Sequence, residues 1–155
     1  MDPDNPVVKL CAQGMEAELA GRPVEARDLF VRAWDARRDD YDASVAAHFV
    51  ARHQPTPEET LRWNQEALAR ADAVGGERVR GFYPSLYLNV GHSHEQLGDP
   101  DEARRFYALA AAAATDLPAG PYGDTVRDGI TRGLQRVTGA RGEGGTGIDW
   151  ENDER

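Results

Sequence analysis

Cysteine and lysine are nearly absent from this sequence of 155 residues, which contains only Cys11 and Lys9 of these two types. One cysteine cannot form an internal disulfide, and this usage fits a reducing compartment. Long hydrophobic runs are missing too, since none approaches the roughly 20 apolar residues that a bilayer-spanning helix needs. The first residues, MDPDNPVVKL, also lack the charged and then apolar regions of a secretory signal. We therefore expect a cytoplasmic protein that does not bind a membrane.

The formal net charge is −9, because 27 acidic residues outnumber 18 basic ones. Such a charge disfavours generic binding to nucleic acids and to anionic membranes, and it favours solubility and a basic partner. The abundance of arginine and alanine is typical of a high-GC bacterial coding bias, and both residue types also favour helices. A chain of this length supports one domain with one core.

Motifs of catalysis and metal binding are missing as well. The sequence has no GxSxG and no HExxH or CxxC spacing. We therefore predict a non-enzymatic protein and assign no catalytic residue, no cofactor and no metal ligand. His92 and Glu95 lie three residues apart and share a face of a helix, whereas His92 and His94 point away from each other. A small-molecule or metal-binding pocket around His92 and Glu95 is therefore a minor alternative.

Three short segments of the chain share proline at the second place and glutamate at the fourth. They are RPVEA, TPEET and DPDEA, and their prolines at positions 23, 57 and 100 are separated by 34 and 43 residues. Proline fits the first turn of a helix, and Thr56 and Asp99 are suitable capping residues just before it, whereas Arg22 is not. Glu59 and Glu102, three residues after their caps, are expected to complete capping boxes. Each segment therefore predicts the start of a helix.

The third segment lies in the stretch Pro84 to Ala111, which carries a family signature. The signature residues are Tyr87, Asn89, Val90, Gly91, Gly98, Asp99, Asp101, Glu102, Ala103, Tyr107 and Ala110. With these residues the stretch closely resembles a tetratricopeptide repeat (TPR), a helix–turn–helix unit of about 34 residues. The resemblance implies an all-α fold, a right-handed superhelical stack of about three TPR-like hairpins with a C-terminal closing helix.

Apolar residues recur at helical spacing through most of the chain, and no alternating strand pattern occurs. The expected helices cover about 7–20, 24–37, 41–53, 58–73, 77–97, 101–115 and 122–137. The fifth begins between Glu77 and Pro84, because Pro84 can either start the helix or kink it. We expect a repeat domain over 1–138 and a flexible, glycine-rich acidic tail over 139–155, in which Ile148 and Trp150 form a short apolar motif.

The closing helix contains Gly123, Gly129 and Gly133, each of which is expected to weaken it by roughly 1 kcal/mol relative to alanine. It should therefore depend on docking for its stability. Trp34 and Trp63 fall on second helices of hairpins, where aromatic residues of this family usually pack between neighbouring hairpins.

In TPR stacks the first helix of each hairpin lines a concave surface. The inward-facing slots of the family, transferred by register, place nine residues in this groove: Met15, Glu18, Asp42, Phe49, Arg52, Ser85, Leu88, His92 and Glu95. The resemblance implies a non-catalytic protein–protein interaction module that binds a peptide or helix of a partner. The alternative is a self-associating, homodimeric module, because three hairpins are near the minimum for stability. Another open possibility is that some of these residues contact the closing helix instead.

His48 interrupts the register of the second hairpin. The repeat has Gly or Ala at this slot, because the neighbouring helix packs closely there. Either His48 holds the helices apart, or the register slips by one residue and Ala47 fills the small slot. The slip would turn Phe49 and Arg52 out of the groove. Asn89 is expected to be a structural amide bonded to the backbone.

Overall fold

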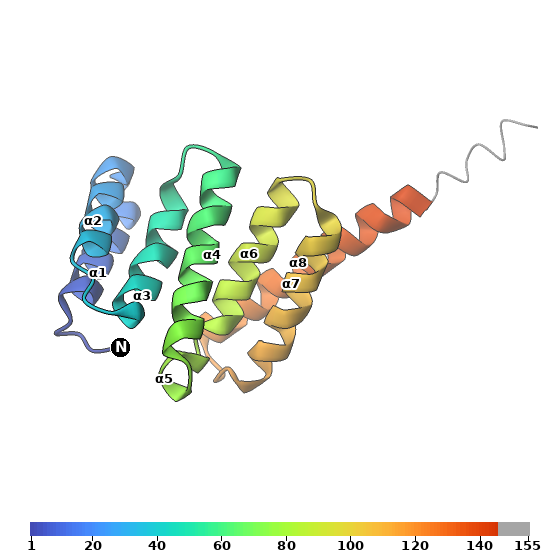
Figure 1. Cartoon of the computed structure of the whole chain (residues 1–155). Coiled ribbons are helices and arrows are strands. Elements are labelled where there is room, and N and C mark those ends of the chain that lie inside the picture. Colours follow the sequence, from blue (N-terminus) through green and yellow to red (C-terminus); the bar gives the residue numbers. More distant parts are fainter. Residues whose placement is uncertain (146–155) are drawn as a thin grey trace, which may run out of the picture.

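The structure is a computed structural model that describes residues 1–145. These residues form helices joined by turns, without a strand (Figure 1). The α-helices are α1 (Pro6–Leu19), α2 (Pro23–Asp35), α3 (Asp40–Val50), α4 (Pro57–Val74), α5 (Glu77–Arg80), α6 (Tyr83–Gln96), α7 (Pro100–Ala113) and α8 (Pro121–Gly145). Two 3₁₀ turns, η1 (Ala51–His53) and η2 (Ala114–Asp116), follow α3 and α7. The all-α prediction is confirmed for the described residues. None of their helices combines the length and the apolarity that crossing a membrane requires.

Consecutive helices pair as hairpins, α1 with α2, α3 with α4, and α6 with α7. Figure 1 shows the three hairpins side by side in chain order. In the first and third hairpins a glycine lets the helices approach. A Cβ atom on Gly14 would lie 2.3 Å from the Phe30 ring, and one on Gly91 would lie 2.9 Å from the Tyr107 ring. Both rings are fully buried, so a small residue opposite a large aromatic one holds each hairpin together.

The predicted helix caps are present at Thr56 and Asp99. Thr56 Oγ1 accepts a hydrogen bond from the Glu59 N–H, and Asp99 Oδ1 accepts one from the Glu102 N–H, each at 3.2 Å. The other half of the predicted capping box is not formed at Glu102. Its carboxylate binds the Arg105 guanidinium instead, at 3.0 and 3.2 Å, because that exposed partner lies one turn further along the helix.

The junction between the second and third hairpins contains the separate short helix α5. Gly75 and Gly76 precede it with φ values of +66° and +73°, a backbone conformation that glycine adopts without strain. Val79 is fully buried and anchors α5 to the core. Pro84 lies in the first turn of α6, so it begins that helix and does not kink it.

The closing helix α8 packs across α6 and α7 and continues beyond them (Figure 1). Its glycines permit this docking. A Cβ on Gly133 would lie 2.6 Å from the Tyr107 ring, and one on Gly129 would lie 3.2 Å from Leu88 Cδ2. The glycines that weaken the helix in isolation are therefore required for its close contact with the hairpin beneath.

The boundary of α8 differs from the predicted one. The helix continues to Gly145, past residue 139 where the tail was predicted to begin. The proposed tail motif of Ile148 and Trp150 lies outside the described residues.

Candidate functional site

An apolar pocket of about 500 Å³ lies where the first helices of the three hairpins meet the beginning of α8. Its lining residues are Met1, Met15, Ser44, Val45, His48, Phe49, Gly81, Phe82, Ser85, Leu86 and Tyr122. Met15, Phe49 and Ser85 were predicted from the sequence to line a groove, and the structure brings these three together in one cavity.

The rim of the pocket carries two large exposed side chains from opposite ends of the sequence. Met15 on α1 is 37% exposed and Tyr122 on α8 is 58% exposed. The Tyr122 hydroxyl is hydrogen-bonded to the Ser85 hydroxyl on α6. This bond fixes the beginning of α8 beside α6, so that the closing helix supplies one wall of the pocket.

His48 forms part of the pocket lining between α3 and α6. Its ring is half-buried, lies edge-on to Phe49 with centroids 5.0 Å apart, and places Nδ1 3.3 Å from Asn89 Nδ2. Loss of solvation, together with the nearby charge of Arg52, lowers the pKa of His48 to about 4. The imidazole is therefore neutral at pH 7, which suits an apolar occupant. Asn89 was expected to bond to the backbone, but its amide nitrogen lies against this ring.

Burial is continuous up to the register break of the second hairpin, where Ala46 and Ala47 are both fully buried. His48, in contrast, is half-buried and faces the pocket. Phe49, which the slipped register would turn out of the groove, lines the pocket and stacks on Phe30 with ring centroids 5.2 Å apart. Phe49 is 8% exposed, so most of its side chain packs in the core and the remaining surface lines the cavity.

Two predicted groove residues, Glu18 and Arg52, bind each other. Arg52 Nη2 lies 2.7 Å from one oxygen of Glu18, and His53 Nε2 lies 2.6 Å from the other. Glu18 is half-buried and Arg52 is exposed. These contacts join the ends of α1 and of the α3–η1 segment, so the charges at this end of the predicted groove already compensate one another.

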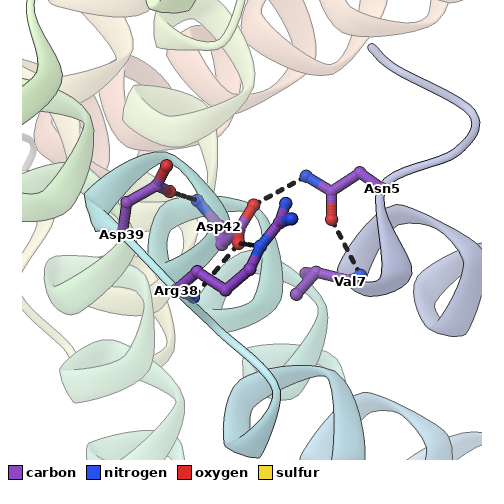
Figure 2. Close-up of polar contacts among 5 residues, drawn as sticks. All are labelled: Asn5, Val7, Arg38, Asp39 and Asp42. Atoms are coloured by element: carbon purple, nitrogen blue, oxygen red, sulfur yellow. Dashed lines mark hydrogen bonds and ion pairs between the residues drawn. The ribbon is translucent and has the colours of Figure 1, made fainter.

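Asp42 was predicted to line the groove, but it is buried at 1% exposure (Figure 2). Asn5 Nδ2 donates a hydrogen bond to its carboxylate at 2.7 Å, and the Arg38 side chain and backbone N–H donate at 2.9 and 3.1 Å. Burial raises the pKa of this carboxyl, but the hydrogen bonds from Arg38 and Asn5 outweigh burial, and the pKa lies below its ordinary value. Asp42 therefore attaches the N-terminal segment to α3 and does not face a partner.

The closing helix covers most of the groove predicted for the third hairpin. Leu88 packs against α8. Glu95 binds Arg136 of α8 at 2.7 and 3.1 Å and accepts a hydrogen bond from the Tyr107 hydroxyl at 2.6 Å. The bond from Arg136 is the main reason that the pKa of Glu95 is lowered. Of the residues predicted on this hairpin, only His92 is exposed.

The contacts of Glu95 do not favour the minor alternative, a ligand pocket around His92 and Glu95. Both oxygens of Glu95 are engaged by Arg136, and the pocket lining includes neither residue. Within residues 1–139, whose side chains the structure describes, no three His, Cys, Asp or Glu residues are placed to share a metal ion. Cys11 is buried, which raises the pKa of its thiol to about 12, so it is not a thiolate at neutral pH.

Most of the other lining residues were not found by sequence reasoning, and Phe82, Leu86 and Tyr122 are the largest side chains among those it did not place. Phe82 lies in the junction before α6, where the spacing of the repeats is irregular and the register gives no direction. Tyr122 shares its helical spacing with Val126 and Ile130, which are buried on the packing face of α8, so periodicity alone assigns it to that face. Its position in the first turn of α8, before the helix reaches α7, is the feature that distinguishes Tyr122 from Val126 and Ile130.

Comparisons with known proteins add no assignment, since no protein-family model, no curated protein and no solved structure matches this chain.

Proposed function

We propose that this chain is a TPR-like helical-repeat module that binds a protein partner through the apolar pocket on its first-helix side. The bound group is a large apolar side chain, such as leucine or phenylalanine, presented by a peptide or helix. The module is non-catalytic and needs no cofactor. Its three hairpins form a right-handed superhelical stack that α8 closes.

Repetition of the same packing device supports the repeat assignment. Gly14 opposite Phe30 and Gly91 opposite Tyr107 are equivalent small-to-aromatic contacts in the first and third hairpins. The helices that follow the turns begin with proline in each of the three hairpins. Sequence and packing therefore favour the same repeating unit.

The apolar pocket is the observation that carries the proposed activity. A cavity of about 500 Å³ is large enough for one apolar side chain. Exposed large apolar residues at its rim, Met15 and Tyr122, would be removed from water by a ligand. The neutral His48 on the wall offers a hydrogen-bonding group without a full charge, so the preferred ligand combines an apolar anchor with nearby polar backbone.

Selection of peptides from a random displayed library on the immobilised full chain tests this proposal. We expect the enriched peptides to share one large apolar residue, and its replacement by glycine to abolish binding. The double substitution Met15→Gln with Tyr122→Ala is expected to weaken binding about tenfold or more, because burial of one such side chain contributes roughly 1.5–3 kcal/mol. Both positions are at the rim, so the hairpin cores should survive, whereas Phe49→Ala would also damage the core. Tyr122→Phe removes only the hydrogen bond to Ser85 and therefore separates loss of apolar contact from loosening of the start of α8.

Val24→Ala is the matched control, because Val24 is apolar and 73% exposed on α2 and does not line the pocket. Binding should be unchanged in this variant. A library that yields no common apolar anchor, or binding equally retained by the rim variant and the control, contradicts the proposal.

Self-association is the second candidate function. Val24 and Val31 lie seven residues apart on α2, share a helix face, and are 73% and 41% exposed. They could cover each other in a dimer formed through the first hairpin. Sedimentation velocity at micromolar concentration should then show a dimer that Val24→Glu dissociates, and a monomer throughout would exclude this candidate.

A further inference from the structure

A second cleft, of about 420 Å³, lies between α2 and α4. Its aromatic wall consists of Trp34 and Trp63, whose ring centroids are 4.9 Å apart with their planes at 87°. The prediction that these tryptophans pack between neighbouring hairpins is confirmed. Both remain half-buried, and the surface they leave exposed lines the cleft. The cleft shares no lining residue with the apolar pocket, so it is a separate surface.

The α4 wall of this cleft alternates acidic and aromatic groups. Glu59, Trp63 and Glu66 are spaced by four and three residues, which places them on one face of the helix. Glu66 Oε1 accepts a hydrogen bond from Arg70 at 2.8 Å. A ring face between two carboxylates attracts a cation, both by charge and through the electron-rich π surface.

Glu59 points most directly to a missing donor. One of its oxygens, Oε2, is buried and accepts no hydrogen bond from the described residues. The other oxygen lies 3.8 Å from Arg62 Nη2, which is longer than a hydrogen bond, and the Arg62 side chain is 72% exposed. The Glu59 side chain as a whole is 36% exposed, so rotation of its carboxylate can present this oxygen to the N–H group of an incoming ligand, which would supply the donor that a buried carboxylate oxygen requires.

One of the two tryptophans already stacks with a guanidinium group of the chain itself, that of Arg37, which does not line the cleft. The Arg37 guanidinium carbon lies 3.9 Å from the centroid of a Trp34 ring, and Arg37 Nη1 donates to the Trp34 carbonyl oxygen at 2.7 Å. A planar guanidinium can stack on indole and donate hydrogen bonds in its own plane at the same time. An ammonium group has no plane to stack.

We propose that this cleft binds an arginine side chain of a basic partner segment. The guanidinium stacks on Trp63 and donates a hydrogen bond to Glu59 Oε2, and its aliphatic stem covers the exposed edge of Trp34. The net charge of −9 favours approach of such a segment. Arg62 is the competing internal cation, and the ligand displaces its loose pairing with Glu59.

Nuclear magnetic resonance titration of the full chain with the peptide acetyl-Gly-Arg-Gly-amide tests the proposal. The readouts are the indole N–H signals of Trp34 and Trp63, which we expect to move in a saturable manner. The same peptide with citrulline in place of arginine keeps the shape and loses the charge, and it is expected to cause no saturable shift. Glu59→Gln should raise the dissociation constant about tenfold, the effect of one charge-assisted hydrogen bond.

Glu58→Gln is the matched control, because Glu58 is the exposed neighbour in the same helical turn and does not line the cleft. It is expected to leave the dissociation constant within about twofold. Arg62→Ala should lower the dissociation constant, since it removes the competing cation. Met15→Gln in the apolar pocket should have no effect, which separates this site from the proposed function.

Equal shifts with the arginine and citrulline peptides would overturn the proposal, as would the absence of saturation. An unchanged dissociation constant in Glu59→Gln would also overturn it. If that variant loses its helical circular dichroism, Arg62→Ala decides instead, and a dissociation constant that it fails to lower contradicts the site.

Discussion

Individual polar side chains in this protein divide between a structural network and the pocket. Asp42 binds Asn5 and Arg38, and these hydrogen bonds attach the N-terminal segment to α3. His48, only six positions further along the same helix, faces the cavity and is kept neutral by its surroundings. The transferred repeat register placed Asp42 in the groove. The sequence alone does not distinguish a surface carboxylate from one that is buried by a partner 37 residues away, which here is Asn5.

His48 makes stability depend on pH. Its folded-state pKa of about 4 lies below the value of 6.5 that applies in the unfolded chain, so the unfolded state takes up a proton first as the pH falls. Stability therefore decreases between pH 6.5 and pH 4. We expect His48→Ala to remove roughly 2 kcal/mol of the stability difference between pH 7 and pH 5. Urea denaturation at the two pH values measures it.

The control for this pH dependence is His92→Ala, because His92 is exposed on α6. That variant should keep the wild-type difference between the two pH values. An identical pH dependence in wild type and His48→Ala would show that the folded protein does not hold this ring in its neutral form.

Among the helices, α8 has the greatest effect on the candidate site. Its first turn builds one wall of the pocket through Tyr122, and its later turns cover Leu88 and bind Glu95. The part of the expected groove that belongs to the third hairpin is thus largely occupied by the chain itself. Helical periodicity predicted that this helix exists and is amphipathic. Its position could not be predicted, because repeat register gives directions only within the repeats.

Substitution of the glycines of α8 tests how closely it docks. Gly133→Ala is expected to destabilise the protein by about 1–3 kcal/mol, because the new methyl group would meet the Tyr107 ring at 2.6 Å. Gly139→Ala should stabilise it by up to about 1 kcal/mol, because alanine favours the helix and nothing lies within 4 Å of its Cβ position. Thermal unfolding measures both. Equal effects of the two substitutions would contradict the close contact between α8 and α7.

Across the whole molecule, sequence reasoning was most successful where local chemistry decides the structure. The caps Thr56 and Asp99 and the prolines after them marked helix starts that the structure contains. It was less successful where distant parts of the chain meet. The pocket combines Met1, the junction residue Phe82 and Tyr122 with the first helices of the hairpins. Such a combination depends on tertiary packing and leaves no periodic signal in the sequence.

The central claim is that the apolar pocket binds a partner's apolar side chain, and the two methionines of the chain offer a direct measurement. Met1 and Met15 are the only methionines, and both line the pocket. Methyl-¹³C labelling of methionine therefore gives two signals that report on this cavity alone. A library-selected peptide should shift these signals in a saturable manner, and its anchor-to-glycine version should not. Saturable binding that leaves both methyl signals unmoved would contradict the account.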